Sequence, residues 1–215
     1  MDKTEKLLEV RRKLEENAAK LPLARKTSDT VPGEGNPEAE IMFIGEAAGY
    51  YESIERRPFV GPAGKLLSRC LESVNLRRSD VYISNILKVR PPNNRDPEPA
   101  EIAAYKPYLD AEIRIIKPKV IVTLGRFSMA KFFGPLVRIS QIHGSPRWVS
   151  WEGRQILIVP MYHPAAALRA GRVMADFAAD FAKLPHFLKL ATHPPIQATA
   201  TKTPEPELDE QLNLI

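Results

Sequence analysis

The 215-residue sequence predicts an α/β protein, a three-layer α/β/α sandwich built on a central, mostly parallel sheet of four strands. Two observations predict this fold class. Four short apolar runs have the length of buried strands, and segments with helical spacing of apolar residues separate them. Strands that alternate with helices favour a parallel sheet with helices on both faces. The four runs are residues 41–44, 81–84, 119–124 and 156–159.

The first run leads into a loop that is rich in glycine. Residues 45–49 read Gly-Glu-Ala-Ala-Gly, and residues 57–64 read Arg-Pro-Phe-Val-Gly-Pro-Ala-Gly. Closely spaced glycines let the backbone turn sharply and approach a ligand. Apolar residues then recur at helical spacing from Leu66 to Val74, so the order is strand, loop of ligand-binding type, helix. Many α/β proteins share this order, so it indicates a ligand without identifying it.

The other strands also end beside polar residues or glycine. Asn85 follows the second run, Gly125 follows the third, and His163 comes shortly after the fourth. Ligands of open α/β sheets bind beyond the carboxyl ends of the strands. We therefore expect Glu46, Asn85 and His163 to converge on one crevice.

The remaining segments complete the expected domain. We assign residues 1–190 to one domain and residues 191–215, rich in proline and threonine, to a flexible tail. Residues 21–40 connect the first helix to the first strand, and residues 137–151 form a polar, turn-rich excursion. Helices are expected over residues 3–20, 96–117, 126–133 and 172–190, the last interrupted by proline.

Composition and charge restrict the classes of protein. The net charge is +5, and because residues 191–215 carry one lysine and four acidic residues, the rest of the chain carries +8. A basic body suits a polyanionic partner, although an ordinary basic surface has the same charge. A single cysteine excludes an intramolecular disulfide framework and fits a reducing cytosol. We expect a cytoplasmic location, in a bacterium and at the nucleoid. We expect no membrane segment, and we expect a monomer.

Three separated motifs resemble the uracil-DNA glycosylase superfamily, and most of all its family 4. They cover residues 41–64, 85–95 and 163–169, in the family's order, and the resemblance extends over roughly residues 15–190. It implies a DNA repair enzyme that flips uracil out of DNA and hydrolyses its N-glycosidic bond, leaving an abasic site. It implies a monofunctional glycosylase, and we expect no metal.

The resemblance assigns roles in the first motif. Phe59 matches the aromatic residue that stacks on the extruded uracil, although it could equally anchor its loop. Glu52 matches a glutamate that crowds C5 of uracil and refuses the methyl group of thymine. Glu46 is the motif glutamate, and Ala47 stands where other families carry a water-orienting aspartate. Ala48 departs from the family proline and removes a fixed φ.

Asn85 and His163 have the sharpest chemical roles. A carboxamide matches the N3–H donor and O4 acceptor of uracil, whereas cytosine presents the reverse pattern. The mismatch leaves buried groups unpaired, at about 1–3 kcal/mol each. His163 matches the donor that stabilises the uracil anion as the bond breaks. Taken alone, Asn85 could cap a turn and a lone histidine is usually structural.

Two segments are expected to contact DNA. The first is residues 88–95, which surround a pair of prolines after the second strand. The second is residues 168–169, which match the position at which relatives wedge a residue into the duplex. The basic, proline-rich segment could equally be solvated surface. The expected DNA-binding residues are Lys88, Arg90, Asn94, Arg95, Leu168 and Arg169.

Four cysteines hold an iron–sulfur cluster in family 4, and this chain lacks all four. Their places are taken by Ala18, Leu21, Val89 and Tyr105. Such clusters need thiolate ligands, so we predict a cluster-free protein in which residues 15–25 and 86–108 pack directly. The lone Cys70 is expected to be a small core residue.

The tail ends in a sequence that resembles the peptide with which bacterial proteins bind the sliding clamp. Its matching residues are Gln211, Leu212, Leu214 and Ile215. Such a peptide would dock apolar anchors in a pocket and tether the enzyme to replicating DNA.

Two other classes of function stay open. A non-catalytic binder of uracil-containing or damaged DNA would keep the pocket without turnover. A small-molecule α/β enzyme would explain a glycine-rich loop, but the sequence has neither a P-loop lysine nor a dinucleotide fingerprint.

Overall fold

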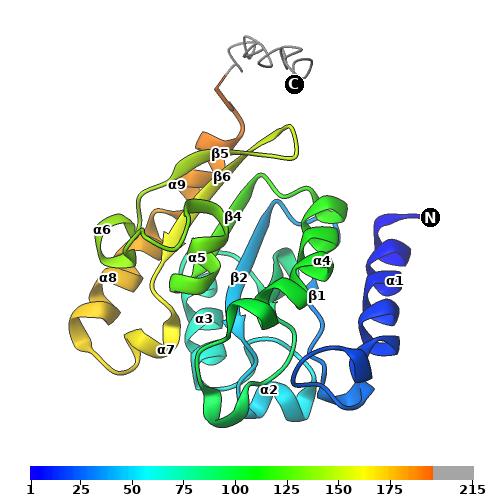
Figure 1. The fold of residues 1–215 in the computed structure, drawn as a ribbon. Coiled ribbons are helices and arrows are strands. Elements are labelled where there is room, and N and C mark those ends of the chain that lie inside the picture. The colour runs from blue at the N-terminus through cyan, green and yellow to red at the C-terminus, as the bar shows by residue number, and fades with distance from the viewer. Residues whose placement is uncertain (196–215) are drawn as a thin grey trace, which may run out of the picture.

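The computed structural model describes residues 1–195 and shows a central sheet covered by helices on both faces (Figure 1). The strand order is β1-β3-β2-β4-β6-β5. The four inner strands are parallel and coincide with the four apolar runs of the sequence. They are β2 (Ile41–Ala47), β3 (Tyr82–Leu87), β4 (Val120–Leu124) and β6 (Arg154–Met161). The expected three-layer α/β/α fold is therefore confirmed.

The sheet has six strands rather than the predicted four, because each edge carries a short antiparallel strand. β1 (Glu34–Gly35) pairs with β3, and β5 (Arg147–Trp151) pairs with β6. β5 lies in the segment that we expected to be irregular. Its aromatic and β-branched residues suit a strand, and Glu152 and Gly153, both with positive φ, make the tight turn into β6.

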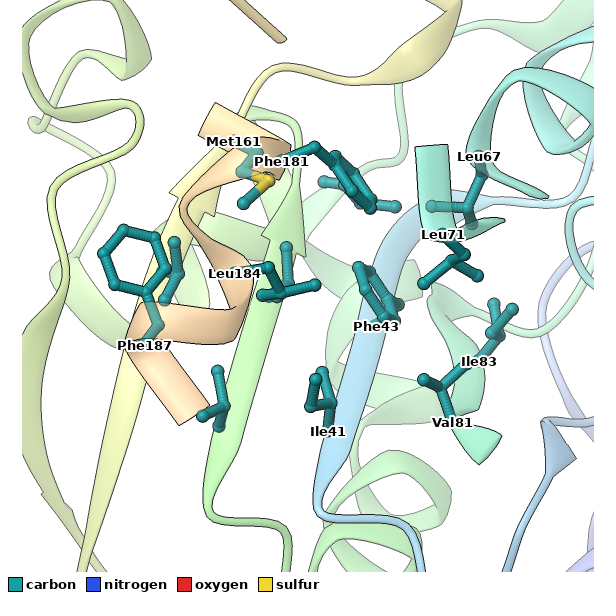
Figure 2. Packing of buried hydrophobic residues seen from close by; sticks show 14 of the residues in the cluster. Ile41, Phe43, Leu67, Leu71, Val81, Ile83, Met161, Phe181, Leu184 and Phe187 are labelled. Carbon is teal, nitrogen blue, oxygen red and sulfur yellow. The ribbon is translucent and has the colours of Figure 1, made fainter. Parts of the chain in front are cut away.

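One face of the sheet packs against α3 (Pro62–Ser73), α7 (Pro164–Ala167), α8 (Gly171–Ala182) and α9 (Leu184–Ala191). Successive side chains of a strand point to opposite faces, so Ile41 and Phe43 of β2 lie on this side. Figure 2 shows Phe43 packed beside the helices, and its ring stacks on Phe181 with centroids 5.8 Å apart. The predicted helix over residues 172–190 is in fact α8 and α9, divided at Lys183.

The opposite face packs against α1 (Lys3–Glu16), α4 (Pro99–Ile116) and α5 (Arg126–Phe133). Met42 and Ile44 of β2 point to this side and meet apolar residues of α4. The predicted helix over residues 3–20 ends as an α-helix at Glu16, and a 3-10 turn (Ala18–Lys20) follows. Two short helices, α2 (Tyr50–Glu55) and α6 (Ile139–Ile142), lie in segments that we expected to be loops.

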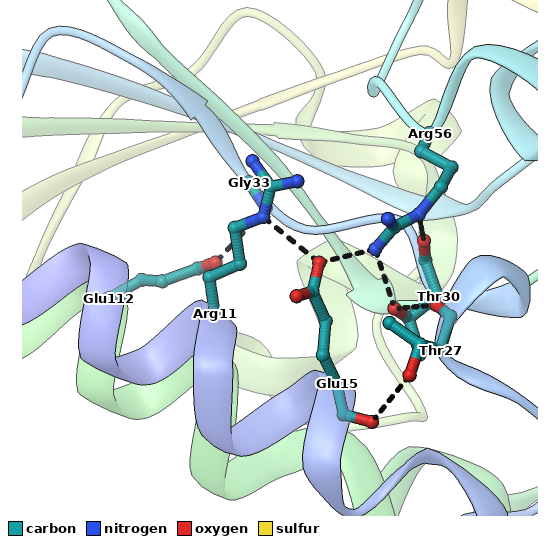
Figure 3. A network of polar contacts seen from close by, with 7 residues as sticks. All are labelled: Arg11, Glu15, Thr27, Thr30, Gly33, Arg56 and Glu112. Atoms are coloured by element: carbon teal, nitrogen blue, oxygen red, sulfur yellow. Dashed lines mark hydrogen bonds and ion pairs between the residues drawn. The ribbon is translucent and has the colours of Figure 1, made fainter.

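A polar network joins the N-terminal segment to the glycine-rich motif (Figure 3). Arg56, which ends α2 with a φ of 53°, donates a hydrogen bond of 3.1 Å from Nε to the carbonyl oxygen of Thr30. Its guanidinium also pairs with Glu15 of α1. These contacts fix α2 to α1 and to the segment around Thr30, which are both distant from it in sequence. They thereby also hold the glycine-rich motif that leads into α2.

No helix within residues 1–195 is both long and apolar enough to cross a membrane. The assignment of a domain to residues 1–190 and a tail to residues 191–215 stays a prediction. The residues of the expected clamp-binding peptide lie outside the described part of the chain.

Candidate functional site

A cavity of about 340 Å³ opens at the carboxyl ends of the parallel strands. The glycine-rich motif after β2, the proline-rich loop after β3 and the start of α7 form its walls. Many of the residues that the sequence singled out meet here. They are Glu46, Ala47, Glu52, Phe59, Asn94, Arg95, His163 and Arg169.

Asn85 was expected to converge with Glu46 and His163, but it lies within β3, which continues to Leu87, and is not among the residues that line the cavity. It stands opposite Gly45 of β2, is 2% exposed, and its Oδ1 atom has no hydrogen-bond partner within the described residues. A Cβ atom on Gly45 would lie 2.4 Å from Asn85 Oδ1 and 2.5 Å from Phe59 Cζ. Only glycine therefore leaves room for the amide and the ring to approach this strand together. An unpaired buried acceptor suits a ligand that donates a hydrogen bond.

Phe59 is held in an unusual backbone conformation beside Asn85. Its φ is 54°, a left-handed value that is uncommon for residues other than glycine. Arg78 fixes it by donating hydrogen bonds to the carbonyl oxygens of Pro58 and Phe59, the latter at 2.9 Å. A Cβ atom on Gly64 would lie 1.9 Å from the oxygen of Phe59, so the motif glycine is required by close backbone approach. Sequence reasoning missed Arg78, because nothing in the motif points to it.

Glu52 anchors the loop that carries Phe59. Its carboxylate accepts hydrogen bonds from the backbone amides of Val60 and Gly61, at 3.0 and 2.8 Å. The side chain also lines the cavity. The expected contact with C5 of a base stays a prediction, but the anchoring contact gives Glu52 a structural role that the sequence did not reveal.

Glu46 lies on the cavity wall at the end of β2. It accepts a hydrogen bond of 3.1 Å from the backbone amide of Phe127 at the start of α5. Burial raises the pKa of this carboxyl above its ordinary value. Gly125, with a φ of 103°, permits the contact, because a Cβ atom there would lie 2.4 Å from Glu46 Oε1.

His163 links β6 to α7 and faces Phe59. Its Nδ1 atom accepts a hydrogen bond of 3.1 Å from the backbone amide of Ala165, which leaves the proton of the neutral ring on Nε2. Burial lowers the pKa of His163 to about 4, so the ring is neutral at physiological pH. The ring centroids of His163 and Phe59 are 5.6 Å apart. A neutral N–H donor therefore stands beside an aromatic wall.

The structure contradicts the expectation that Lys88 contacts DNA. Its side chain is fully buried, and Nζ donates hydrogen bonds to Glu112 Oε2, at 2.5 Å, and to Ser84. The residue follows directly after β3, and its side chain turns toward α4 instead of outward. Motif spacing cannot distinguish a buried lysine from an exposed one.

The other expected DNA contacts remain near the surface around the cavity. Arg90 donates to Asn94 Oδ1 at 2.9 Å, and Arg95 pairs with Glu101. Leu168 is 44% exposed, and Arg169 beside it is exposed as well. These positions do not test whether the residues contact DNA, so the contacts stay predictions.

The four positions that match the family's cluster cysteines meet in one apolar cluster. Ala18, Val89 and Tyr105 are buried in it, and Leu21 packs against it. The Tyr105 hydroxyl donates a hydrogen bond of 2.8 Å to the carbonyl oxygen of Pro22. The two segments therefore pack directly, as expected. This donor set does not fit an iron–sulfur cluster, which needs thiolates.

Other possible metal ligands do not gather within residues 1–195, where no group of three or more histidine, cysteine or acidic side chains could hold a metal ion. Cys70 is partly buried and packs against the main core, as predicted, and burial raises the pKa of its thiol.

Comparison with known proteins agrees with this geometry. The model of the uracil DNA glycosylase superfamily matches residues 32–189. The chain is 49% identical over 161 residues to a type-4 uracil-DNA glycosylase of Saccharolobus solfataricus, covering 73% of this chain and 74% of the relative. It is 47% identical over 162 residues to that of Sulfurisphaera tokodaii, with the same coverage. It is 43% identical over 169 residues to that of Archaeoglobus fulgidus, covering 77% and 85%. The chain belongs to the uracil DNA glycosylase superfamily.

Proposed function

We propose that the protein is a monofunctional uracil-DNA glycosylase that flips uracil out of DNA and hydrolyses its N-glycosidic bond. One observation carries the proposal. Phe59 and the neutral His163 line the same cavity at the carboxyl ends of the strands, and the buried, unpaired Oδ1 of Asn85 and the Phe59 ring both lie close to Gly45. The type-4 relatives support the same activity by their names.

Asn85 selects the base. Its Oδ1 accepts the N3–H of uracil, and its amide nitrogen can donate to O4. Cytosine would place an unprotonated N3 against the same oxygen and an amine against the amide nitrogen. Two buried polar groups would then be unpaired, each at about 1–3 kcal/mol, which corresponds to a large discrimination against cytosine.

His163 stabilises the leaving group. As the bond between C1′ and N1 breaks, its electron pair stays on uracil and negative charge gathers on O2. A preorganised N–H donor aimed at this oxygen lowers the barrier by a few kcal/mol. The hydrogen bond from Ala165 to Nδ1 fixes the tautomer that can donate from Nε2. Water adds to C1′ and releases a proton, and the products are uracil and an abasic site.

We propose that the Glu46 carboxylate orients and polarises the water that attacks C1′. It lines the cavity, and its contact with Phe127 holds one of its oxygens in place. Ala47 carries no carboxylate, so water receives no help from that position. We also propose that the enzyme works without an iron–sulfur cluster, because an apolar cluster fills the place of the ligands.

A cleavage assay tests the proposal. Purified protein, with its iron quantified, is incubated with labelled oligonucleotides that carry uracil, hypoxanthine or thymine and is then treated with alkali. We expect strand breaks at uracil without iron, and their loss in Asn85→Ala. Folded protein that shifts uracil-containing DNA in a gel but yields no breaks would instead support a non-catalytic binder.

We propose a second contact for the C-terminal peptide, which resembles a sliding-clamp ligand in residues 211–215. Deletion of these residues should abolish binding to a bacterial clamp in calorimetry and leave excision from short oligonucleotides unchanged. Equal affinity of the full chain and the deletion variant would exclude this role.

A further inference from the structure

Two exposed tyrosines stand at the mouth of the cavity. Tyr50 and Tyr51 are 55% and 52% exposed and form the first turn of α2. They follow directly after Gly49, which lines the cavity. Figure 1 shows α2 and α7 at the same end of the sheet. Large apolar side chains that gather on a surface mark interaction sites, so the two tyrosines are a candidate binding surface.

The tyrosines are held by the motifs around them. The Arg90 guanidinium lies 5.1 Å from the ring centroid of Tyr50, and it donates to Asn94 as well. The two tyrosine rings meet edge to face with centroids 5.5 Å apart. Tyr51 in turn packs close to Gly61, where a Cβ atom would lie 3.1 Å from Tyr51 Cδ2. Tyr50 is therefore an ordered aromatic surface that loses little conformational freedom when it binds a ligand.

A basic hollow adjoins this surface on the side of Arg90. It measures about 580 Å³ and is formed by residues 23–25 and residues 90–93. Arg25 and Arg90 both line it, and neither guanidinium has an ion-pair partner within residues 1–195. Guanidinium groups that have no carboxylate partner and lie beside an exposed aromatic ring suit single-stranded nucleic acid, which they bind through phosphate contacts and base stacking.

We propose that Tyr50, Arg90 and Arg25 form a subsite for a nucleotide that neighbours the excised uracil in single-stranded DNA. The base of this nucleotide stacks on the face of the Tyr50 ring that Arg90 does not cover, and the adjoining phosphates lie against the two arginines in the hollow. A base inside a duplex is stacked on its neighbours and cannot use the ring, so the subsite favours single-stranded substrate. The inference rests on the proposed function, because the uracil site defines which nucleotide is the neighbour.

Binding measurements with defined variants test the subsite. Affinity is measured by fluorescence anisotropy for single-stranded oligonucleotides that carry a non-cleavable 2′-fluoro-deoxyuridine. We expect Tyr50→Ala to weaken binding about tenfold, the typical effect of losing one base stack. Tyr50→Phe should stay within about twofold of wild type, because the ring remains. Ile54→Ala is the matched control, since Ile54 is exposed on the same helix and is not among the residues that line the cavity or the hollow.

The position of the stacked base is found with abasic spacers. Each nucleotide beside the uracil is replaced in turn by a tetrahydrofuran spacer. At one position the spacer should weaken binding of wild type about tenfold and have no further effect on Tyr50→Ala. Arg90→Gln should reduce the slope of log affinity against log salt by about 0.7, the contribution of one phosphate contact on a single strand.

Three results would overturn the inference. They are unchanged binding by Tyr50→Ala, an equal loss in Ile54→Ala, or an effect of Tyr50→Ala that no spacer removes. An equal loss on duplex DNA would overturn the preference for single strands. Failure of the proposed activity gives a different pattern, because wild type would then bind with the expected spacer effect and yet produce no abasic sites from cleavable substrate.

Discussion

Substitution of Gly45 by alanine should abolish catalysis while the fold survives. Gly45 lies in β2 without a positive φ, so the backbone accepts alanine there. The added Cβ atom would lie 2.4 Å from Asn85 Oδ1 and 2.5 Å from Phe59 Cζ. Ordinary contacts between carbon atoms begin at about 3.5 Å, so both groups must move by roughly 1 Å. The substitution therefore disturbs the two walls that receive the base and adds no polar group.

The magnitude follows from how sharply catalysis depends on geometry. A misplacement of about 1 Å reduces the rate by about 100-fold. Overpacking a well-filled site costs about 1–3 kcal/mol of folding free energy, and each kcal/mol lowers the Tm of a domain of this size by about 2–4 °C. We thus expect Gly45→Ala to be folded at 25 °C and to excise uracil about 100-fold more slowly.

Single-turnover excision from a uracil-containing oligonucleotide measures the rate, and thermal unfolding measures stability. Gly171→Ala is the control, because its added Cβ atom would have no neighbour within 4 Å. Excision by Gly45→Ala at the wild-type rate would refute the assignment of Asn85 and Phe59 to the base site. An equal loss of rate in Gly171→Ala would show that the effect is not specific.

Three further predictions concern the protonation of His163, the buried pair of Lys88 and Glu112, and the hydrogen bond of Tyr105. The imidazole of His163, with its pKa lowered by burial to about 4, should show no NMR titration between pH 8 and 5. Because the unfolded ring binds a proton near pH 6.5, its contribution makes the folded state lose stability as pH falls from about 6.5 toward 4. A midpoint near 6.5 in the folded protein would contradict the buried, neutral ring. Lys88→Met should destabilise the protein by about 3–5 kcal/mol in urea unfolding, because Glu112 is left unpaired, and Glu112→Leu in the same chain should restore most of this. If the slope of log DNA affinity against log salt concentration changed in the double variant, Lys88 would have to be counted among the DNA contacts after all. Tyr105→Phe should cost about 1 kcal/mol through the lost hydrogen bond to Pro22, and an unchanged urea midpoint would show that this bond contributes nothing.

The sequence predicted the fold well where hydrophobic burial is the dominant force. The inner strands are nearly continuous apolar runs, and the helices that cover them have clear periodicity. The edge strands were missed because an edge strand is half exposed and its pairing depends on a neighbour. β5 is stabilised by β6 and by the turn at Glu152 and Gly153, and such a contact does not create an apolar run.

The sequence predicted many of the residues that line the site, but it did not predict the contacts that hold them in place. Glu46 and His163 line the cavity as expected, because motif residues after parallel strands meet at one edge of a sheet. The supporting contacts could not be foreseen. Arg78 binds the loop of Phe59 across about twenty residues of sequence, and Lys88 is fully buried and paired with Glu112 although the other expected DNA contacts lie near the surface. Both depend on side-chain direction, which the spacing of motifs does not contain.

The apolar cluster explains how the chain keeps its cavity without the family's cysteines. The proline-rich loop forms one wall, and two of its residues, Asn93 and Asn94, have positive φ, so it needs firm support at its start. Val89 supplies that support from within the apolar cluster, and it also pairs with Thr30 through an isolated bridge.

The N-terminal side of this support is equally fixed. The backbone amide of Val31 donates a hydrogen bond of 2.7 Å to the carbonyl oxygen of Lys88, and Tyr105 holds the carbonyl of Pro22. Residues 18–31 and the strand that carries Asn85 are therefore joined at several points by packing and hydrogen bonds. The positions that match the family's cluster cysteines belong to the apolar core that joins these segments. Positioning of a loop requires only that its ends be held, and burial of apolar side chains and the hydrogen bonds around them hold both ends of this one.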